Sequence, residues 1–230
     1  MKKIDYTIEN NKANIIMNDG KANAMDFDYF EEMNSALTEI ESSGSRVLII
    51  KGRQGFFSGG LDLKLMSTLA PNDIDKLAET FARTMLRVFL YPIPTVAICT
   101  GHAIAGGAML AFACDRRHGI NGNYRIQVNE IAIGIPLPSW MLLIGKSAIP
   151  SGFQTEALLH AKAYTPKEAH DAGIFHSLGD NSADITAAIN SEVEALMSLH
   201  APAYAISKKR LREKEIKEAL AILKEELPSK

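Results

Sequence analysis

The stretch from Thr95 to Cys114 contains no aspartate, glutamate, lysine or arginine, and this limits the folds that the chain can adopt. A stretch of about 20 apolar residues could cross a membrane as a single helix. Three glycines and His102 interrupt this one, which argues against a continuous span. A buried strand, a tight turn and a buried helix explain it better, and they indicate an α/β protein with a sizeable core.

The N-terminal residues predict a hairpin followed by a helix. Residues 2–9 alternate between apolar and polar side chains, with Ile4, Tyr6 and Ile8 apolar, as in a strand with one buried face. Asn10 and Asn11 mark a turn, and residues 13–17 form the returning strand. Asp26 is a plausible N-cap for the helix that follows.

Short apolar runs alternate with helical patterns along the rest of the chain, and this indicates an α/β fold. The runs at 47–50 and 95–99 predict strands that are buried on both faces. The glycine-containing segments 54–62 and 101–107 are predicted as loops, and residues 72–90 as a helix. Thr165, followed by Pro166 and Glu168, predicts a capped helix start, with Gly173 ending that helix. We expect a core domain at 1–195 and a C-terminal helical region at 196–230.

Charge and cysteine usage exclude several classes of protein. The net charge of −2 indicates neither nucleic acid nor a membrane as a partner. Cys99 and Cys114 lie in apolar runs and are expected to be buried reduced thiols. The first residues lack the apolar core of a secretory signal, so we expect a cytoplasmic location. The six histidines show no metal-ligand spacing, and no metal site is predicted.

The two glycine-containing segments, 54–62 and 101–107, are candidates for an oxyanion hole. Each follows a predicted strand, and α/β proteins bind ligands at such strand ends. Small residues allow backbone N–H groups to approach an oxygen atom closely. Losing one donor of an oxyanion hole typically costs about 3 kcal/mol of barrier. The alternative is that these glycines serve only tight turns and packing.

Three motifs together resemble the crotonase (enoyl-CoA hydratase/isomerase) superfamily. They are FFSGGLDLKLM at 56–66, IPTVAICTGHAIAGGAMLAFACDRR at 93–117 and YTPKEAHDAGIFHSL at 164–178. The resemblance covers roughly residues 1–200. It implies an α/β crotonase (ClpP-like) fold of repeated ββα units with a C-terminal helical region.

The resemblance also implies where an acyl-CoA substrate would bind. The backbone N–H groups of Leu61 and Gly106 would form the oxyanion hole for the thioester carbonyl. The residues that would contact coenzyme A are Lys21, Ala22, Asn23, Gly59, Gly60, Leu61, Asp62, Leu63 and Lys64. Solvated surface lysines are the alternative interpretation of Lys21 and Lys64. Coenzyme A is then part of the substrate, no prosthetic group is implied, and the assembly is expected to be a homotrimer or a dimer of trimers.

Glu130 and Met109 distinguish between the reactions of the family. The family's hydratases carry two glutamates, and here Met109 takes the place of one while Glu130 takes the place of the other. Two carboxylates suit hydration, whereas a single base can remove a proton from C2 and return it at C4. We therefore expect an enoyl-CoA isomerase of fatty acid metabolism that converts 3-enoyl-CoA to trans-2-enoyl-CoA. Met109 would keep the pocket dry, and apolar neighbours should raise the pKa of Glu130.

The segment NEIAIGIPLPSW at 129–140 resembles the pattern of mitochondrial-type Δ3,Δ2-enoyl-CoA isomerases. Trp140 would then form a wall of the acyl pocket, and Asn129 would orient Glu130. An enoyl-CoA hydratase, another crotonase-type reaction, and a CoA-binding protein without activity remain alternatives. Residues 208–224 predict an amphipathic helix, and a contact of residues 208–212 with the CoA 3′-phosphate is one further interpretation.

Overall fold

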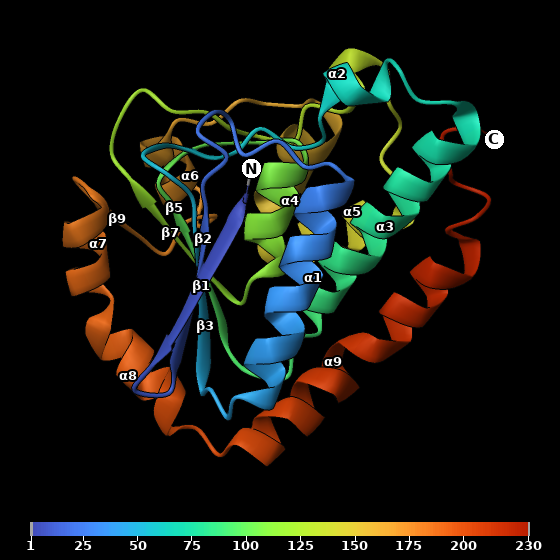
Figure 1. The fold of residues 1–230 in the computed structure, drawn as a ribbon. Coiled ribbons are helices and arrows are strands. Elements are labelled where there is room, and N and C mark those ends of the chain that lie inside the picture. Colours follow the sequence, from blue (N-terminus) through green and yellow to red (C-terminus); the bar gives the residue numbers. More distant parts are fainter. Residues whose placement is uncertain (1, 230) are drawn as a thin grey trace.

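A computed structural model describes residues 2–229, which form two sheets, with helices packed around the larger one (Figure 1). The six-stranded sheet has the order β1 (Ile4–Glu9), β2 (Lys12–Met17), β3 (Val47–Lys51), β5 (Thr95–Cys99), β7 (Arg116–Ile120) and β9 (Ser177–Gly179). The second sheet has the order β4 (Gly55–Ser58), β6 (Gly101–Ile104) and β8 (Ile126–Gln127). Apart from the β1–β2 hairpin, all strands within each sheet are parallel.

The helices lie on both faces of the larger sheet. On one face are α1 (Phe27–Ser42), α3 (Pro71–Phe89), α4 (Gly106–Ala113) and α5 (Ser139–Ala148), and on the other α7 (Ser182–Ala188) and α8 (Asn190–Ser198) (Figure 1). The remaining helices are α2 (Leu63–Met66), α6 (Pro166–Asp171) and α9 (Ala201–Ile222), with short helical turns at Ile131–Ile133, Ser151–Phe153 and Thr155–Leu159. The expected boundary at residue 195 stays a prediction, and α8 extends across it.

The strands β3 and β5 are buried on both faces, as their continuous apolar runs predict. Leu48 and Ile50 belong to the main core, whereas Val47 and Ile49 pack in a smaller cluster with Ile185 of α7. Successive apolar residues of these strands therefore pack alternately into the two clusters, which explains why the sequence shows no polar alternation here.

The N-terminal hairpin is confirmed, but the expected burial of its first strand is wrong. Asn10 and Asn11 have φ values of 50° and 60°, which suit a tight turn. Ile4 is buried, whereas Tyr6 and Ile8 are 39% and 38% exposed. β1 is the edge strand of the sheet, and the core reaches only its first residue.

The two segments predicted entirely as loops, 54–62 and 101–107, contain β4 and β6, so this prediction is wrong in part. The two strands pair with each other in parallel, with Gly55 opposite Gly101. A Cβ atom on Gly101 would lie 2.0 Å from the carbonyl carbon of Gly55, so only glycine permits this approach. Strands of four residues that depend on such a close contact leave little periodic signal in the sequence.

The helix caps that the sequence predicts are confirmed at α1 and α6. Asp26 accepts a hydrogen bond from the Tyr29 backbone N–H at the start of α1. Thr165 and Glu168 form the predicted capping box of α6, and Gly173 follows that helix at φ 74°. Each signal depends only on residues a few positions apart, which is why the sequence suffices to predict it.

Candidate active site

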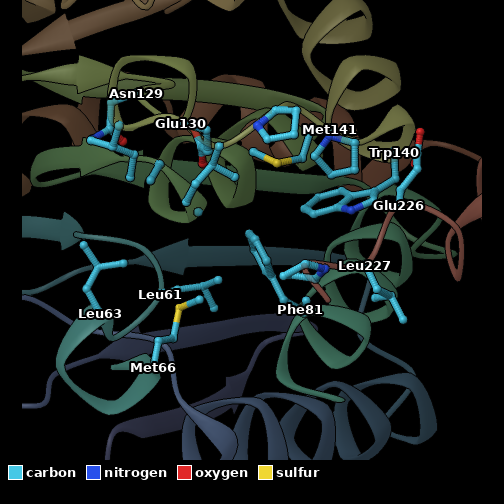
Figure 2. Close-up of a pocket in the computed structure, with 18 of the residues that line it drawn as sticks. Leu61, Leu63, Met66, Phe81, Asn129, Glu130, Trp140, Met141, Glu226 and Leu227 are labelled. Atoms are coloured by element: carbon cyan, nitrogen blue, oxygen red, sulfur yellow. The ribbon is translucent and has the colours of Figure 1, made fainter. Parts of the chain in front are cut away.

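A cavity of about 490 Å³ opens beside the first residues of α4. Its lining includes Gly59, Leu61, Gly106, Glu130 and Trp140, which come from four separate parts of the chain. Figure 2 shows the Glu130 carboxylate and Leu61 facing the same space from opposite sides. The fold thus brings together the residues that the sequence suggested as an oxyanion hole and a proton carrier.

The two glycine-containing loops touch directly at this cavity. Gly60 has a φ of +85°, and its Cα lies against the backbone of Gly106. Within residues 2–229, no hydrogen-bond acceptor is found for the backbone N–H of Leu61 or of Gly106. Two unpaired amides in residues that line the same cavity are suited to bind a ligand oxygen.

The turn that leads into α4 is held in an unusual conformation. Ala105 has a φ of 50° and a ψ of −123°, and its N–H donates to the Gln127 carbonyl oxygen over 2.8 Å. Gly106 is the first residue of α4, so its amide lies at the positive end of the helix dipole. This position favours a partial negative charge on a bound oxygen atom.

Asn23, expected to contact coenzyme A, uses its side chain inside the protein. Its amide nitrogen donates to the carbonyl oxygens of Met17, Phe56 and Phe57 over 3.0 to 3.1 Å. Its Oδ1 accepts from the Asp19 N–H over 3.0 Å, and the residue is only 2% exposed. The Asn23 side chain therefore positions the segment 56–60 next to the cavity.

The other residues expected to contact coenzyme A lie on the same loops. The Gly59 N–H donates to the Ala22 carbonyl oxygen over 2.8 Å, and Asp62 caps α2. Lys21 and Lys64 are exposed, and neither forms an ion pair within the described chain. Gly59, Leu61 and Leu63 line the cavity, so this loop forms its rim.

Glu130 is the acidic residue at the inner part of the cavity. It is 7% exposed, and its Oε2 has no hydrogen-bond partner among the described residues. Burial raises the pKa of Glu130 to about 7, and hydrogen bonds from the backbone amides of Glu130 and Asn129 oppose this shift. Because its pKa is close to neutral, the carboxyl group can both take up and release a proton at neutral pH.

The predicted pocket residues Trp140 and Met109 differ in their positions. Trp140 lines the cavity and packs edge-on against Phe81, with ring centroids 4.8 Å apart. Met109 is fully buried in the core of α4 and is not among the residues that line the cavity. Asn129 also lines the cavity, and its buried Oδ1 has no partner within residues 2–229.

Two features of the site were missed or misread in the sequence. Residues Leu223 and 225–228 line the cavity, although nothing in their local pattern indicates a contact with residues 59–140. The interpretation that residues 208–212 contact a CoA phosphate does not hold for Lys208 and Arg212, and for Lys209 and Arg210 it stays a prediction. Lys208 and Arg212 instead bind the Asp115 carboxylate over 2.7 and 2.9 Å.

The sequence profile of the enoyl-CoA hydratase/isomerase family matches residues 7–226. The chain belongs to this family. The α/β crotonase fold expected from the resemblance is likewise confirmed, because an enoyl-CoA isomerase of Mycobacterium tuberculosis superposes with a TM-score of 0.87 at 29% identity. That match covers 96% of each chain.

Two relatives in the enoyl-CoA hydratase/isomerase family carry different activity names. A probable enoyl-CoA hydratase of Bacillus subtilis is 33% identical over 59% of this chain and 50% of its own length. Enoyl-CoA delta isomerase 3 of Arabidopsis thaliana is 29% identical over 69% of this chain and 66% of its own length. The chain thus matches between half and two thirds of the length of these relatives. Among the described residues, no helix combines the length and apolarity that a membrane crossing requires.

Proposed function

We propose that the protein moves the double bond of a 3-enoyl-CoA to give trans-2-enoyl-CoA. Leu61 and Gly106 donate their backbone N–H groups to the thioester oxygen. Glu130 removes a proton from C2, the electrons shift to form a dienolate, and the same proton returns at C4. The atoms balance without a co-reactant, and coenzyme A takes part only as a portion of the substrate.

The observation that supports this proposal is a single buried carboxylate that shares a cavity with two residues whose backbone N–H groups are unpaired within residues 2–229. Glu130 is the one buried acid among the cavity-lining residues between 2 and 229, since Glu225 and Glu226 are exposed. One carboxyl group with a pKa of about 7 is sufficient for two successive proton transfers. Hydration would also need a group that activates water. The family resemblance implies that the fully buried Met109 stands where the family's hydratases carry a second glutamate.

The decisive experiment compares two substrates. The protein is incubated separately with a 3-enoyl-CoA and with a 2-enoyl-CoA, and the products are separated by chromatography. We expect rapid conversion of the 3-enoyl-CoA and little 3-hydroxyacyl-CoA from either substrate. Strong formation of 3-hydroxyacyl-CoA with negligible double-bond migration would instead assign the protein as a hydratase.

A second experiment separates catalysis from binding. In Glu130→Gln, acyl-CoA affinity should be retained while the isomerisation rate falls by several orders of magnitude. The matched control is Glu218→Gln, which changes an exposed carboxylate on α9 and should leave the rate unchanged. Equal background activity in wild type and Glu130→Gln would favour a CoA-binding protein without catalytic activity.

We further propose that the protein acts in the cytoplasm as a homotrimer or a dimer of trimers. Ile131, Ile133 and Ile135 follow Glu130 in the chain and are 39%, 49% and 40% exposed, and the last two also line the cavity. Such an apolar surface suits burial against a second copy of the chain. Measurement of the molar mass in solution tests the assembly, and a monomer at micromolar concentration would contradict it.

A further inference from the structure

The C-terminal segment, defined here as residues 223–229, lies across the cavity from the catalytic groups. Leu223 and residues 225–228 contribute to its lining. In Figure 2, Leu61 and Glu130 lie toward one side, and Glu226 and Leu227 lie toward the other. Phe81 and Trp140 are nearer to the C-terminal segment, so an acyl chain that extends away from the thioester would pass along these rings.

Specific hydrogen bonds hold the C-terminal segment in this place. The Glu226 carboxylate accepts from the Ser139 N–H over 2.9 Å and from the Ser139 hydroxyl over 2.6 Å. Ser139 is the first residue of α5, so an acidic group at this helix end is favoured by the helix dipole. The Ser229 N–H also donates to Asp75 of α3 over 3.0 Å. The segment is thus tied to both helices that carry the aromatic wall.

The preceding helix fixes where the C-terminal segment begins. Leu223 is 3% exposed and belongs to the main core, next to the end of α9. Toward the start of α9, Tyr204, Lys208 and Arg212 all bind the Asp115 carboxylate. Because α9 is anchored in this way, the segment that follows it leaves the helix at a fixed position beside the cavity.

We propose that the C-terminal segment is the end wall of the acyl cavity and sets the longest acyl chain that the protein accepts. Glu226 acts as a positioning residue, because its bonds to Ser139 keep Leu227 against the cavity. This inference deepens the proposed function and rests on it for the identity of the ligand as an acyl-CoA. The chain selected is an unbranched apolar one, since aromatic and aliphatic side chains line most of the path.

The dependence of affinity on chain length follows from the hydrophobic effect. Each methylene group that becomes buried should tighten binding about fourfold. Once the chain reaches Leu227, a further methylene has no space, so the gain should stop. The chain length at which the gain stops is therefore a direct measure of the position of the wall.

The experiment titrates the protein with saturated straight-chain acyl-CoAs of increasing length and records each dissociation constant by calorimetry. Two substitutions should move the limit in opposite directions. Leu227→Trp should shorten the longest chain that still gains affinity, whereas Glu226→Ala should lengthen it by freeing the segment from Ser139. The matched control is Glu218→Ala, an exposed α9 carboxylate whose loss should leave the limit unchanged.

The two substitutions are expected to shift the chain-length limit in opposite directions, which distinguishes an end wall from a general loss of stability. A protein that is only destabilised would not bind longer chains with higher affinity. Thermal unfolding of each variant checks that it is folded. An identical chain-length limit in all variants, with tight acyl-CoA binding, would overturn the end wall and leave the proposed function intact. A wild-type protein that binds no acyl-CoA of any length would overturn both.

Discussion

A methyl group added to the Cα of Gly60 would lie 2.8 Å from the backbone nitrogen of Gly106. These residues belong to separate loops, and each loop provides one of the two unpaired amides at the cavity. The close contact fixes the distance between the loops, because neither backbone can move aside without disturbing a strand or α4. Glycine at position 60 is therefore required by the packing of the loops as well as by its positive φ.

The first prediction concerns Gly60→Ala. The positive φ and the contact with Gly106 should together reduce the free energy of unfolding by about 2–5 kcal/mol. The control is Gly20→Ala, which has a φ of +73° but no atom within 4 Å of the added methyl group. The free energy of unfolding of Gly20→Ala should fall by only about 1 kcal/mol. Urea unfolding measures both, and equal losses would show that the contact with Gly106 contributes nothing.

The second prediction concerns the stability cost of ionising Glu130. Its pKa rises from 4.5 in the unfolded chain to about 7 in the native state, so the native state binds the extra proton between these values. The contribution of Glu130 to stability is most favourable below pH 4.5 and is lost as the pH rises through about 7. Between pH 4.5 and about 7, the free energy of unfolding of the wild type should fall by about 2–3 kcal/mol relative to that of Glu130→Gln. Parallel stability curves for the two proteins would contradict the raised pKa.

The third prediction concerns the pH dependence of the reaction. A carboxylate that removes a proton from C2 must be ionised in the free enzyme, so kcat/KM should rise with pH and level off above an apparent pKa near 7. An ordinary exposed glutamate would instead give a profile that is already level above about pH 5. Initial rates with a 3-enoyl-CoA over a range of pH measure the profile. A level profile through neutral pH would remove Glu130 as the base.

The fourth prediction concerns Asp115, which joins α9 to the core. Burial alone would raise the pKa of Asp115, but the nearby Lys208 and Arg212 hold it below its usual value. Asp115→Asn would leave these two cations without a counterion. Lys208 is only 5% exposed, so the free energy of unfolding should fall by about 3–5 kcal/mol.

Asp171→Asn serves as the control for Asp115, because its ion pair with Lys167 is exposed. This change should alter stability by less than about 0.5 kcal/mol. Chemical denaturation measures the two variants under the same conditions. If the free energy of unfolding fell by a similar amount in Asp115→Asn and Asp171→Asn, the Asp115 contacts would not anchor α9.

The sequence by itself determined the features that depend on near neighbours. The turn at Asn10, the cap at Asp26 and the capping box at Thr165 each involve residues within a few positions of one another. The strands buried on both faces were also readable, since a continuous apolar run directly records burial. The motifs around Leu61 and Gly106 placed the chain in its family, and the apolar neighbours of Glu130 pointed to its raised pKa.

Only the tertiary structure decided which distant residues meet. The pairing of β4 with β6, the use of the Asn23 amide to hold the segment 56–60, and the placing of residues 223–229 over the cavity all join parts far apart in the chain. Local periodicity carries no record of such contacts, because a side chain's partners across the fold depend on how whole helices and sheets pack. The chemical groups of the site could therefore be named from the sequence, whereas the shape and far end of the cavity required the fold.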